Sequence, residues 1–345
     1  MLAVLLATAL TVQPNPVYIE TTSGGRQSVN CDLIIESSSA APLDIDEIEL
    51  SVFDRAGKLV LRRFVDGNGT RPSIRTIDAS EVPAKSQVLV FNPFHTFDPE
   101  VELASMRFIV RLSTKDGNTR ERATVTVNPR PYAGAAKLIL PVKGRQIVYD
   151  GHDFYAHHRR WDFTIPGLRQ LGFRTNFMRY SFDFVPVDEN GNMSRGDEEK
   201  NENWFGFGRE VRAAADGNVV AVADSQPDDR QFSPAMIAER GTMAIWGNYV
   251  VIDHGGGEFG LYGHIKQGSS RVKPGQRVRR GDIVAAIGAA GSSKFPHLHF
   301  ELQDGPDTNA EGRPSTFHDF DRLYGARRVR VRAGSVDSGD LIDGR

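Results

Sequence analysis

The residues best suited to chemistry are two histidines separated by one leucine, His297-Leu298-His299. If this segment is a β-strand, alternate side chains point to opposite faces, so both imidazoles share one face at about 6–7 Å separation. Leu298 and Phe300 then share the other face and can pack in a core. Two imidazoles on one face suit a zinc ion and a catalytic group beside it. The alternative interpretation is a pair of surface histidines on an edge strand.

More residues of these chemical types lie upstream of the pair. His264 ends an apolar run, and Asp183 lies inside another. A buried carboxylate is costly unless it is paired or bound to a metal. Adjacent histidines, His157 and His158, come earlier still. Catalytic zinc sites commonly use three nitrogen or oxygen ligands from the protein and leave one position for water, so two histidines and one carboxylate of this set would meet that need.

The order of these motifs resembles the lysostaphin-type (LytM-like) zinc endopeptidases, which cut peptidoglycan cross-bridges. The resemblance covers residues 150–303 and is most specific in the segment 296–301, Pro-His-Leu-His-Phe-Glu. It implies a zinc-dependent metalloendopeptidase that hydrolyses peptide stems of bacterial peptidoglycan or another peptide substrate. The other matching stretches are 180–185, 207–217, 247–254, 262–264, 272–282 and 288–301.

The resemblance also implies roles for individual residues. Zn²⁺ would be bound by His158, Asp183 and His299, and the catalytic residues without a bond to the metal would be His264 and His297. One of these two would take a proton from the attacking water and the other would stabilise the oxyanion. The sequence does not assign which does which.

Two of the three implied ligands have competitors. In the simplest family pattern the first histidine and the aspartate lie four residues apart, and His158 and Asp162 have that spacing. We prefer Asp183 because its setting, Phe-Asp-Phe-Val, resembles the family's buried strand. Residues 159–179 then form an insertion that shapes the substrate groove. The alternatives to His158 are His157 and His152.

Two more polar residues near these motifs are interpreted as structural. Tyr262 could donate a hydrogen bond in the site, but a tyrosine in such a strand more often packs in the core. His254 precedes three glycines and is interpreted as a turn residue without a catalytic role.

Strand patterns run through the whole chain and predict a mainly β protein. In residues 15–130, short apolar segments alternate with turn signals such as Asp66-Gly67-Asn68-Gly69. Six or seven short strands at this spacing predict an immunoglobulin-like β-sandwich. Because His95 is its one histidine, we expect a scaffold or a docking module for a protein partner. The expected strands are 33–35, 48–53, 59–61, 88–91, 106–112 and 123–127.

Composition changes after the Pro129–Gly134 segment, since seven of the nine histidines lie between 152 and 299. We expect an antiparallel β-sheet lysostaphin-type peptidase domain there, with short helices near 165–171 and 233–239 and a last exposed, arginine-rich strand near 327–332. The predicted organisation is a signal segment (1–14), the immunoglobulin-like β-sandwich (15–130), a linker (131–149), the zinc peptidase domain (150–305) and a C-terminal extension (306–345).

Bulk properties limit the compartment and the partners. The net charge of −2 gives no sign of a nucleic-acid partner. The one cysteine excludes an intrachain disulfide and a cysteine-based zinc site. The apolar start, residues 1–12, has the length of a signal-peptide core and is too short for a transmembrane span. We therefore expect export to the periplasm or cell envelope; the alternative for this segment is a buried first strand.

Two other functions compete with hydrolysis. The first is a non-catalytic LytM-like domain that binds the cell wall or activates another wall hydrolase. Such relatives typically lack ligand residues, whereas every role has a candidate here. The second is a biotinyl- or lipoyl-type carrier, because residues 272–282 resemble the glycine turn of those modules. The nearby lysines do not lie in the motif that such a carrier needs.

Overall fold

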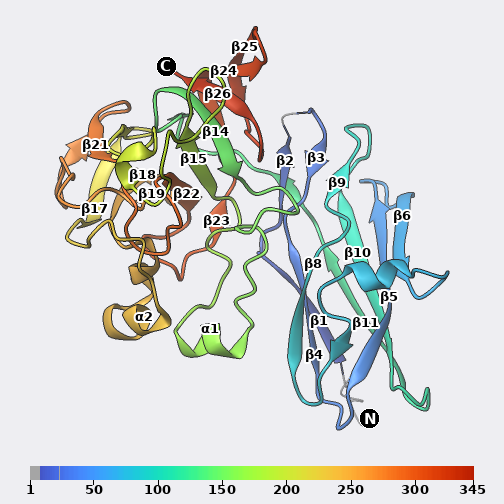
Figure 1. The fold of residues 1–345 in the computed structure, drawn as a ribbon. Helices are drawn as coiled ribbons and strands as arrows, with labels where there is room; N and C mark the ends of the chain where they lie inside the picture. Colours follow the sequence, from blue (N-terminus) through green and yellow to red (C-terminus); the bar gives the residue numbers. More distant parts are fainter. Residues whose placement is uncertain (1–7, 23) are drawn as a thin grey trace. The chain divides into compact units, whose positions relative to one another are not determined.

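The structure is a computed structural model that describes residues 8–22 and 24–345 of the 345-residue chain. It is mainly β, as predicted. The chain divides into two compact units, Met1–Tyr132 and Ala133–Arg345, and Figure 1 shows their strands. Among the described residues, no helix has the length and apolar character needed to cross a membrane.

The first unit contains three small sheets, and all six predicted strand segments lie in its strands. Side chains from the first two sheets meet in one core that includes Leu33, Leu50 and Phe108. The immunoglobulin-like classification stays a prediction. The sheets, in spatial order, are β1 (Thr8–Gln13), β4 (Asp32–Ser37) and β8 (Gln87–Phe91); β11 (Arg120–Val127), β10 (Ser105–Ser113), β5 (Leu43–Phe53) and β6 (Leu59–Asp66), with β7 (Glu81–Val82) beside β5; and β12 (Arg130–Pro131), β2 (Tyr18–Thr21), β3 (Gln27–Ser28) and β9 (Thr96–Phe97).

Strand β1 contains the second half of the segment predicted as a signal, residues 1–14. It pairs antiparallel with β4, and Leu10 and Val12 enter the core. This arrangement matches the alternative interpretation, a buried first strand. Residues 1–7 of the predicted segment lie outside the described residues, and export stays a prediction.

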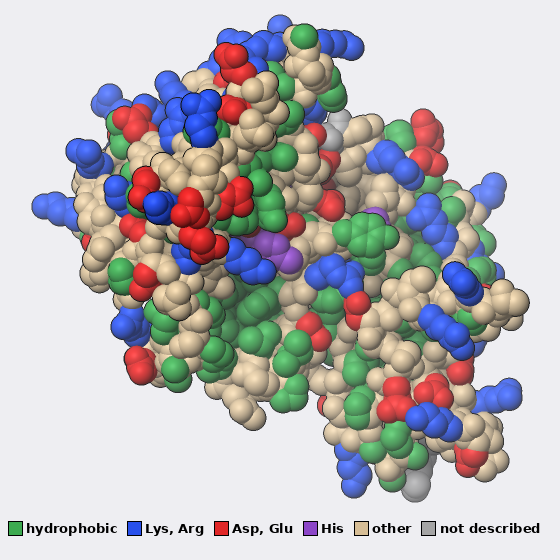
Figure 2. Space-filling view, viewed as in Figure 1, with side chains coloured by type: hydrophobic (Ala, Val, Ile, Leu, Met, Phe, Trp, Pro, Cys, Tyr) green, Lys and Arg blue, Asp and Glu red, His purple; other side chains and the backbone are tan. Residues whose placement is uncertain are grey.

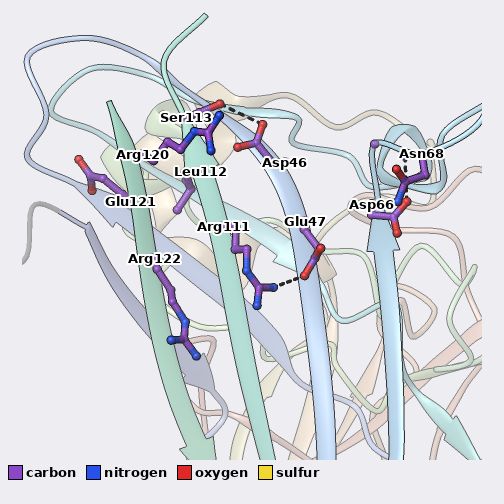
Figure 3. A pocket seen from close by; sticks show the side chains of 11 residues that line it. Asp46, Glu47, Asp66, Asn68, Arg111, Leu112, Ser113, Arg120, Glu121 and Arg122 are labelled. Atoms are coloured by element: carbon purple, nitrogen blue, oxygen red, sulfur yellow. Dashed lines mark hydrogen bonds and ion pairs between the residues drawn. The ribbon is translucent and has the colours of Figure 1, made fainter. Parts of the chain in front are cut away.

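A hollow on the first unit lies over β5, β10 and β11 (Figure 3). Charged side chains of both signs line it. Arg111 pairs with Glu47, and the Ser113 hydroxyl donates a hydrogen bond to Asp46 at 3.1 Å. Its lining contains no histidine. None of its lining residues belongs to a candidate metal group among the described residues.

The second unit is built around a twelve-stranded sheet in which every pair is antiparallel except β13 with β24. Its central strands place the site. The main path, in spatial order, is β13 (Leu138–Ile139), β24 (Phe317–Tyr324), β26 (Leu341–Gly344), β14 (Gly144–Asp150), β15 (Phe182–Pro186), β22 (Leu298–Gln303), β19 (Glu258–Gly263), β18 (Tyr249–Gly255), β17 (Gly217–Ala223) and β20 (Arg277–Val278); β23 (Gly312–Arg313) pairs with β22, and β25 (Arg327–Gly334) with β24.

The predicted alternation is present in β22. Leu298, Phe300 and Leu302 belong to the hydrophobic core of the unit. The residues between them, His299 and Glu301, are polar and equally buried. Since successive side chains of a strand point to opposite faces, the second face of the sheet is a buried polar layer. It must satisfy its own charges and hydrogen bonds.

The second unit extends beyond the predicted peptidase domain, 150–305, at both ends. The predicted linker, 131–149, contains β13 and nearly all of β14, and the predicted extension, 306–345, contains β23 to β26. Glu258 fixes the start of the unit, because its carboxylate accepts hydrogen bonds from the backbone N–H groups of Ala135 and Ala136 at 2.9 and 2.7 Å. Both segments are therefore integral parts of the sheet unit.

The remaining elements of the second unit are short. The two predicted helices form as α1 (Pro166–Gln170) and α2 (Pro234–Arg240). A small sheet joins β16 (Glu210–Arg212) to β21 (Ile283–Ala286), and 3₁₀ turns occur at η2 (Asn201–Asn203) and η3 (Thr242–Trp246), besides η1 (Ser73–Thr76) in the first unit.

The predicted arginine-rich strand is β25. In Figure 2, Lys and Arg side chains gather at the top of the view, where Figure 1 draws β24 and β25. Arg328 pairs with Asp343 at 2.7 Å and Arg330 with Asp319 at 2.9 Å. These pairs favour a solvated, internally neutralised face over a binding patch.

Candidate metal centre

Three residues expected to bind metal come together on the polar face of the sheet. One ligand atom each from His158, Asp183 and His299 lies within 4.8 Å of the others. Asp183 Oδ1 is 3.5 Å from His158 Nε2 and 3.2 Å from His299 Nδ1. All three side chains are buried. Two imidazole nitrogens and one carboxylate oxygen, out of bulk solvent, are the donor set of a catalytic zinc site, so these residues fit the ion.

Strand register explains how two of these residues meet across 116 positions of sequence. Asp183 on β15 lies directly opposite His299 on β22. On its other side, His299 lies opposite Gly263 of β19. A Cβ at Gly263 would come within 3.1 Å of the Trp246 ring, which packs against His299 at 4.2 Å between ring centroids. The missing side chain therefore leaves room for the indole that supports the imidazole.

The two expected catalytic histidines flank this group. His297 Nε2 lies 3.3 Å from Asp183 Oδ1, and the ring centroids of His264 and His297 are 4.9 Å apart. His297 Nδ1 donates to Phe295 O, and His264 Nδ1 donates to Ala290 O, each at 2.8 Å. A carbonyl only accepts, so Nδ1 carries a proton in both rings. In the neutral form each ring keeps Nε2 as its proton acceptor.

The backbone of His264 adopts a left-handed conformation with φ +58°, which is uncommon for a residue with a side chain. Its N–H donates to Trp246 O at 3.2 Å, and its C=O accepts from Gly288 N at 2.9 Å. Such conformations persist where the surrounding structure enforces them and cluster at functional sites. Hydrogen bonds on both sides of the residue enforce this one.

Two glycines make the close approach that supports His264. Gly247 has φ +61° and Gly291 has φ +73°, and a Cβ on either would lie 2.3 Å from the backbone nitrogen of the other. Any side chain would separate the segments that carry Trp246 and Ala290. Those segments supply the two carbonyls that accept hydrogen bonds from His264.

Burial and charge set the protonation of the centre. Burial lowers the pKa of His158 well below its ordinary value, against the attraction of Asp183. Burial also lowers the pKa of His264 to about 3, with His297 and His299 adding to the effect. For His299 burial opposes the charge, but hydrogen bonds to Asp183 and Glu301 raise the pKa to about 9.

Asp183 is the anionic part of the group. Burial would raise its pKa, yet the attraction of His158 and His297 keeps the pKa well below the ordinary value. An ionised carboxylate among buried imidazoles is an environment that favours a bound cation.

The alternative ligands differ in their surroundings, and of them only His157 lies in a candidate metal group of the described residues, with Asp150 and His158. Asp162 accepts hydrogen bonds from the N–H and hydroxyl of Thr164 at 2.8 and 2.5 Å and lies in neither candidate metal group among the described residues. The His157 side chain is 65% exposed and pairs with Asp150 at 2.8 Å. His152 packs edge-on against the rings of Tyr180 and Phe182.

The residues interpreted as structural also lie apart from the group. The Tyr262 hydroxyl accepts a hydrogen bond from Ala214 N at 2.7 Å, within the hydrophobic core. His254 bonds through Nδ1 to Asp216 O at 2.9 Å. Both observations agree with their structural interpretation.

The insertion, residues 159–179, packs beside the polar layer. Trp161, Phe173 and Phe177 form a ring cluster, and Phe177 contacts Trp246 at 5.7 Å between centroids. Since Trp246 packs on His299, the insertion supports the centre through one aromatic neighbour.

Sequence reasoning missed two carboxylates beside the expected ligands. Asp150 lies opposite Asp183 in the β14–β15 register and contacts His158. Asp150 is the first residue after the expected linker, and no local sequence pattern there indicates a functional residue. Glu301 contacts His299, and the two-residue alternation of β22 could have identified it, because it shares a face with His299.

Comparison with known proteins finds a family match within the second unit. Residues 205–310 match Peptidase family M23. This range contains His264, His297 and His299 and begins after His158 and Asp183. The catalytic domain of lysostaphin from Staphylococcus simulans is a structural neighbour with 18% identity, which covers 49% of this chain and 88% of that one at a TM-score of 0.27.

Curated relatives include proteins of two kinds. The murein hydrolase activator EnvC of Escherichia coli is 33% identical over 96 residues, which is 28% of this chain and 18% of the relative. The peptidoglycan DD-endopeptidase ShyA of Vibrio cholerae is 45% identical over 56 residues, 16% of this chain and 13% of the relative. The chain thus spans less than a fifth of the length of these relatives. Residues 205–310 thus carry a Peptidase family M23 domain, the LytM-like family that the sequence resembles.

Proposed function

We propose that this protein is a zinc-dependent metalloendopeptidase that hydrolyses peptide cross-links of bacterial peptidoglycan. The observation that carries the proposal is the buried group of His158, Asp183 and His299, with the Nε2 atom of His297 beside it. The substrate class is supported by relatives named as peptidoglycan DD-endopeptidases.

The ligand residues would be His158 through Nε2, Asp183 through Oδ1 and His299 through Nδ1. A zinc ion held there supplies Lewis-acid chemistry and makes water nucleophilic near neutral pH. Because Asp183 and the two imidazoles are already gathered and buried, little reorganisation is needed to bind the ion.

The two remaining histidines handle protons and developing charge. Each has Nδ1 fixed on a backbone carbonyl, which leaves Nε2 for proton transfer, and Nε2 of His297 lies 3.3 Å from Asp183 Oδ1. A neutral Nε2 takes the proton of the attacking water, and a protonated Nε2 donates a hydrogen bond to the oxyanion or a proton to the leaving amine. Burial holds His264 neutral, so its Nε2 carries no proton until the ring accepts one.

The test compares single substitutions in the full chain by metal analysis and by digestion of purified sacculi, with mass spectrometry of the fragments. We expect His299→Ala to lose both zinc and hydrolysis. His264→Ala and His297→Ala should keep zinc and lose about 10²–10⁴-fold in rate, the usual contribution of a general acid or base. His254→Ala is the matched control and should keep both. A His297→Ala protein without zinc would refute the division between ligands and catalytic residues.

A second function is supported by the similarity to EnvC, which is named a murein hydrolase activator. In that case the domain would bind the wall or activate another hydrolase without cutting peptides. Wild-type protein that binds no zinc and releases no fragments from sacculi would favour it. Stoichiometric zinc together with released fragments would exclude it.

Two broader expectations belong to the same proposal. Export to the periplasm or cell envelope is supported by the substrate class and by relatives named for murein and peptidoglycan. The first unit is proposed as a docking module for a protein partner, since the hollow over β5, β10 and β11 is lined largely by acidic and arginine side chains and contains no histidine.

A further inference from the structure

Glu301 is a fully buried carboxylate that the proposed mechanism does not use. Its Oε2 accepts a hydrogen bond from Ser181 Oγ at 2.5 Å and lies 3.2 Å from His299 Nε2. Its Oε1 accepts a hydrogen bond from Gln303 Nε2. A buried carboxylate accepts but cannot donate, so His299 must carry a proton on Nε2 to satisfy it. The ring nitrogen that can then bind a metal is Nδ1, which lies 3.2 Å from Asp183 Oδ1.

Asp150 lies beside the other proposed ligand histidine, His158, as Glu301 lies beside His299. Its Oδ2 lies 3.2 Å from His158 Nδ1 and 3.3 Å from the backbone nitrogen of the same residue. His158 Nδ1 is buried and makes no hydrogen bond of standard geometry, so this carboxylate is an acceptor within reach. With a proton on Nδ1, His158 can bind a metal through Nε2, which lies 3.5 Å from Asp183 Oδ1.

We propose that Asp150 and Glu301 are positioning residues of the metal centre, which fix opposite ring protons so that His158 offers Nε2 and His299 offers Nδ1 to the ion. The inference rests on the proposed function, in which these histidines bind zinc. Outer carboxylates of this kind orient a ligand ring, select its tautomer and increase its basicity.

The fold gives the two carboxylates their places. Asp150 is the register partner of Asp183 across β14 and β15, one strand away from the ligand carboxylate. Glu301 follows His299 by two residues on β22, so the two side chains share the polar face. Asp150, Asp183 and His299 therefore form one row across β14, β15 and β22, and Glu301 lies beside this row on β22.

A competing interpretation gives Asp150 a metal of its own. Asp150, His157 and His158 also bring one potential ligand atom each within 4.8 Å of the others. For this group to bind an ion beside the first, His158 would have to use both ring nitrogens and lose both ring protons. His157 is largely exposed and shares Oδ2 of Asp150 at 2.8 Å, so we interpret it as a competitor for the carboxylate rather than a ligand.

The test uses the metal-stripped full chain and titrates zinc against a chromogenic chelator. We expect one zinc per wild-type chain, and affinities about 10–100-fold weaker in Asp150→Ala and Glu301→Gln, the usual effect of removing such a support. Matched carboxylate controls are Asp153→Asn, on the same segment as Asp150, and Glu258→Gln, a buried glutamate on β19. Both controls should bind zinc as the wild type does, and His157→Ala should bind it at least as tightly.

A second measurement does not depend on variants that must fold. In zinc-loaded wild-type protein with ¹⁵N-labelled histidine, long-range ¹H–¹⁵N spectra should place the remaining ring proton of His158 on Nδ1 and that of His299 on Nε2. The opposite protonation of either ring would overturn the inference. So would equal zinc affinity in the wild type and both carboxylate variants.

Two other outcomes are equally decisive. Two zinc ions per wild-type chain that fall to one in His157→Ala would make Asp150 a metal ligand and overturn its positioning role. A wild-type chain that binds no zinc would refute the proposed function itself, and the inference with it. Weakened zinc binding in both carboxylate variants alongside normal binding in both controls supports it.

Discussion

The substitution Tyr262→Phe tests whether the Tyr262 hydroxyl has a structural or a catalytic role. The hydroxyl lies in the hydrophobic core and accepts a hydrogen bond from Ala214 N at 2.7 Å, and both residues are fully buried. Removing the oxygen leaves a buried N–H without its acceptor, which costs about 1–3 kcal/mol. In a unit of roughly 200 residues, each kcal/mol lowers Tm by about 2–4 °C, so we expect a decrease of about 2–12 °C.

The assay combines thermal unfolding with zinc titration and fragment release from sacculi. Zinc affinity and rate should stay at wild-type values, because Tyr262 is on the face opposite His299. Tyr249→Phe is the matched control: it lies on the next strand, is half-buried, and should change stability by less than about 0.5 kcal/mol. A Tyr262→Phe protein of unchanged Tm but strongly reduced rate would refute the reasoning and give the hydroxyl a catalytic role.

Four other predictions follow from particular contacts. Gly291→Ala should destabilise the second unit by more than about 1–3 kcal/mol in urea unfolding, because the new Cβ would lie 2.3 Å from Gly247 N in addition to the strain of a left-handed backbone. Gly257→Ala, where the backbone is also left-handed but no atom lies within 4 Å of the new Cβ, should cost only about 1–2 kcal/mol. Asp162→Asn should leave zinc affinity unchanged in titration, because its carboxylate serves Thr164. Zinc at about 100 times its Kd should raise the unfolding free energy by about 2.7 kcal/mol, and calorimetry should find no such gain in His299→Ala. Phe108→Ala, in the first unit's core, should cost about 3–5 kcal/mol by denaturant unfolding without changing zinc stoichiometry.

Local patterns predicted the elements of this protein well. The alternation in 106–112 and 123–127 corresponds to β10 and β11. Of the two histidines predicted to share a strand, His299 lies in β22, whereas His297 directly precedes it. The mainly β class and the LytM-like family could be predicted because strand alternation and the family's motifs each lie within short stretches of sequence.

Features that depend on distant pairing were harder to predict. The segments 131–149 and 306–345 resembled a linker and an extension, yet β14 and β26 pair with each other inside the main sheet. Neither strand has a strong alternation of its own, so only the pairing reveals them. Asp150 was missed for the same reason, since its importance comes from lying opposite Asp183.

The choice between Asp162 and Asp183 shows why sequence spacing alone was insufficient. A four-residue spacing from His158 is the stronger local pattern, and it favours Asp162. The sheet favours Asp183 instead, because β15 lies between the strand of Asp150 and the strand of His299. Asp183 can then meet an imidazole from each side, while Asp162 stays bonded within its own turn. The buried polar layer has one carboxylate placed to meet both rings, and its position in the strand order, rather than its distance along the chain, makes it the expected ligand.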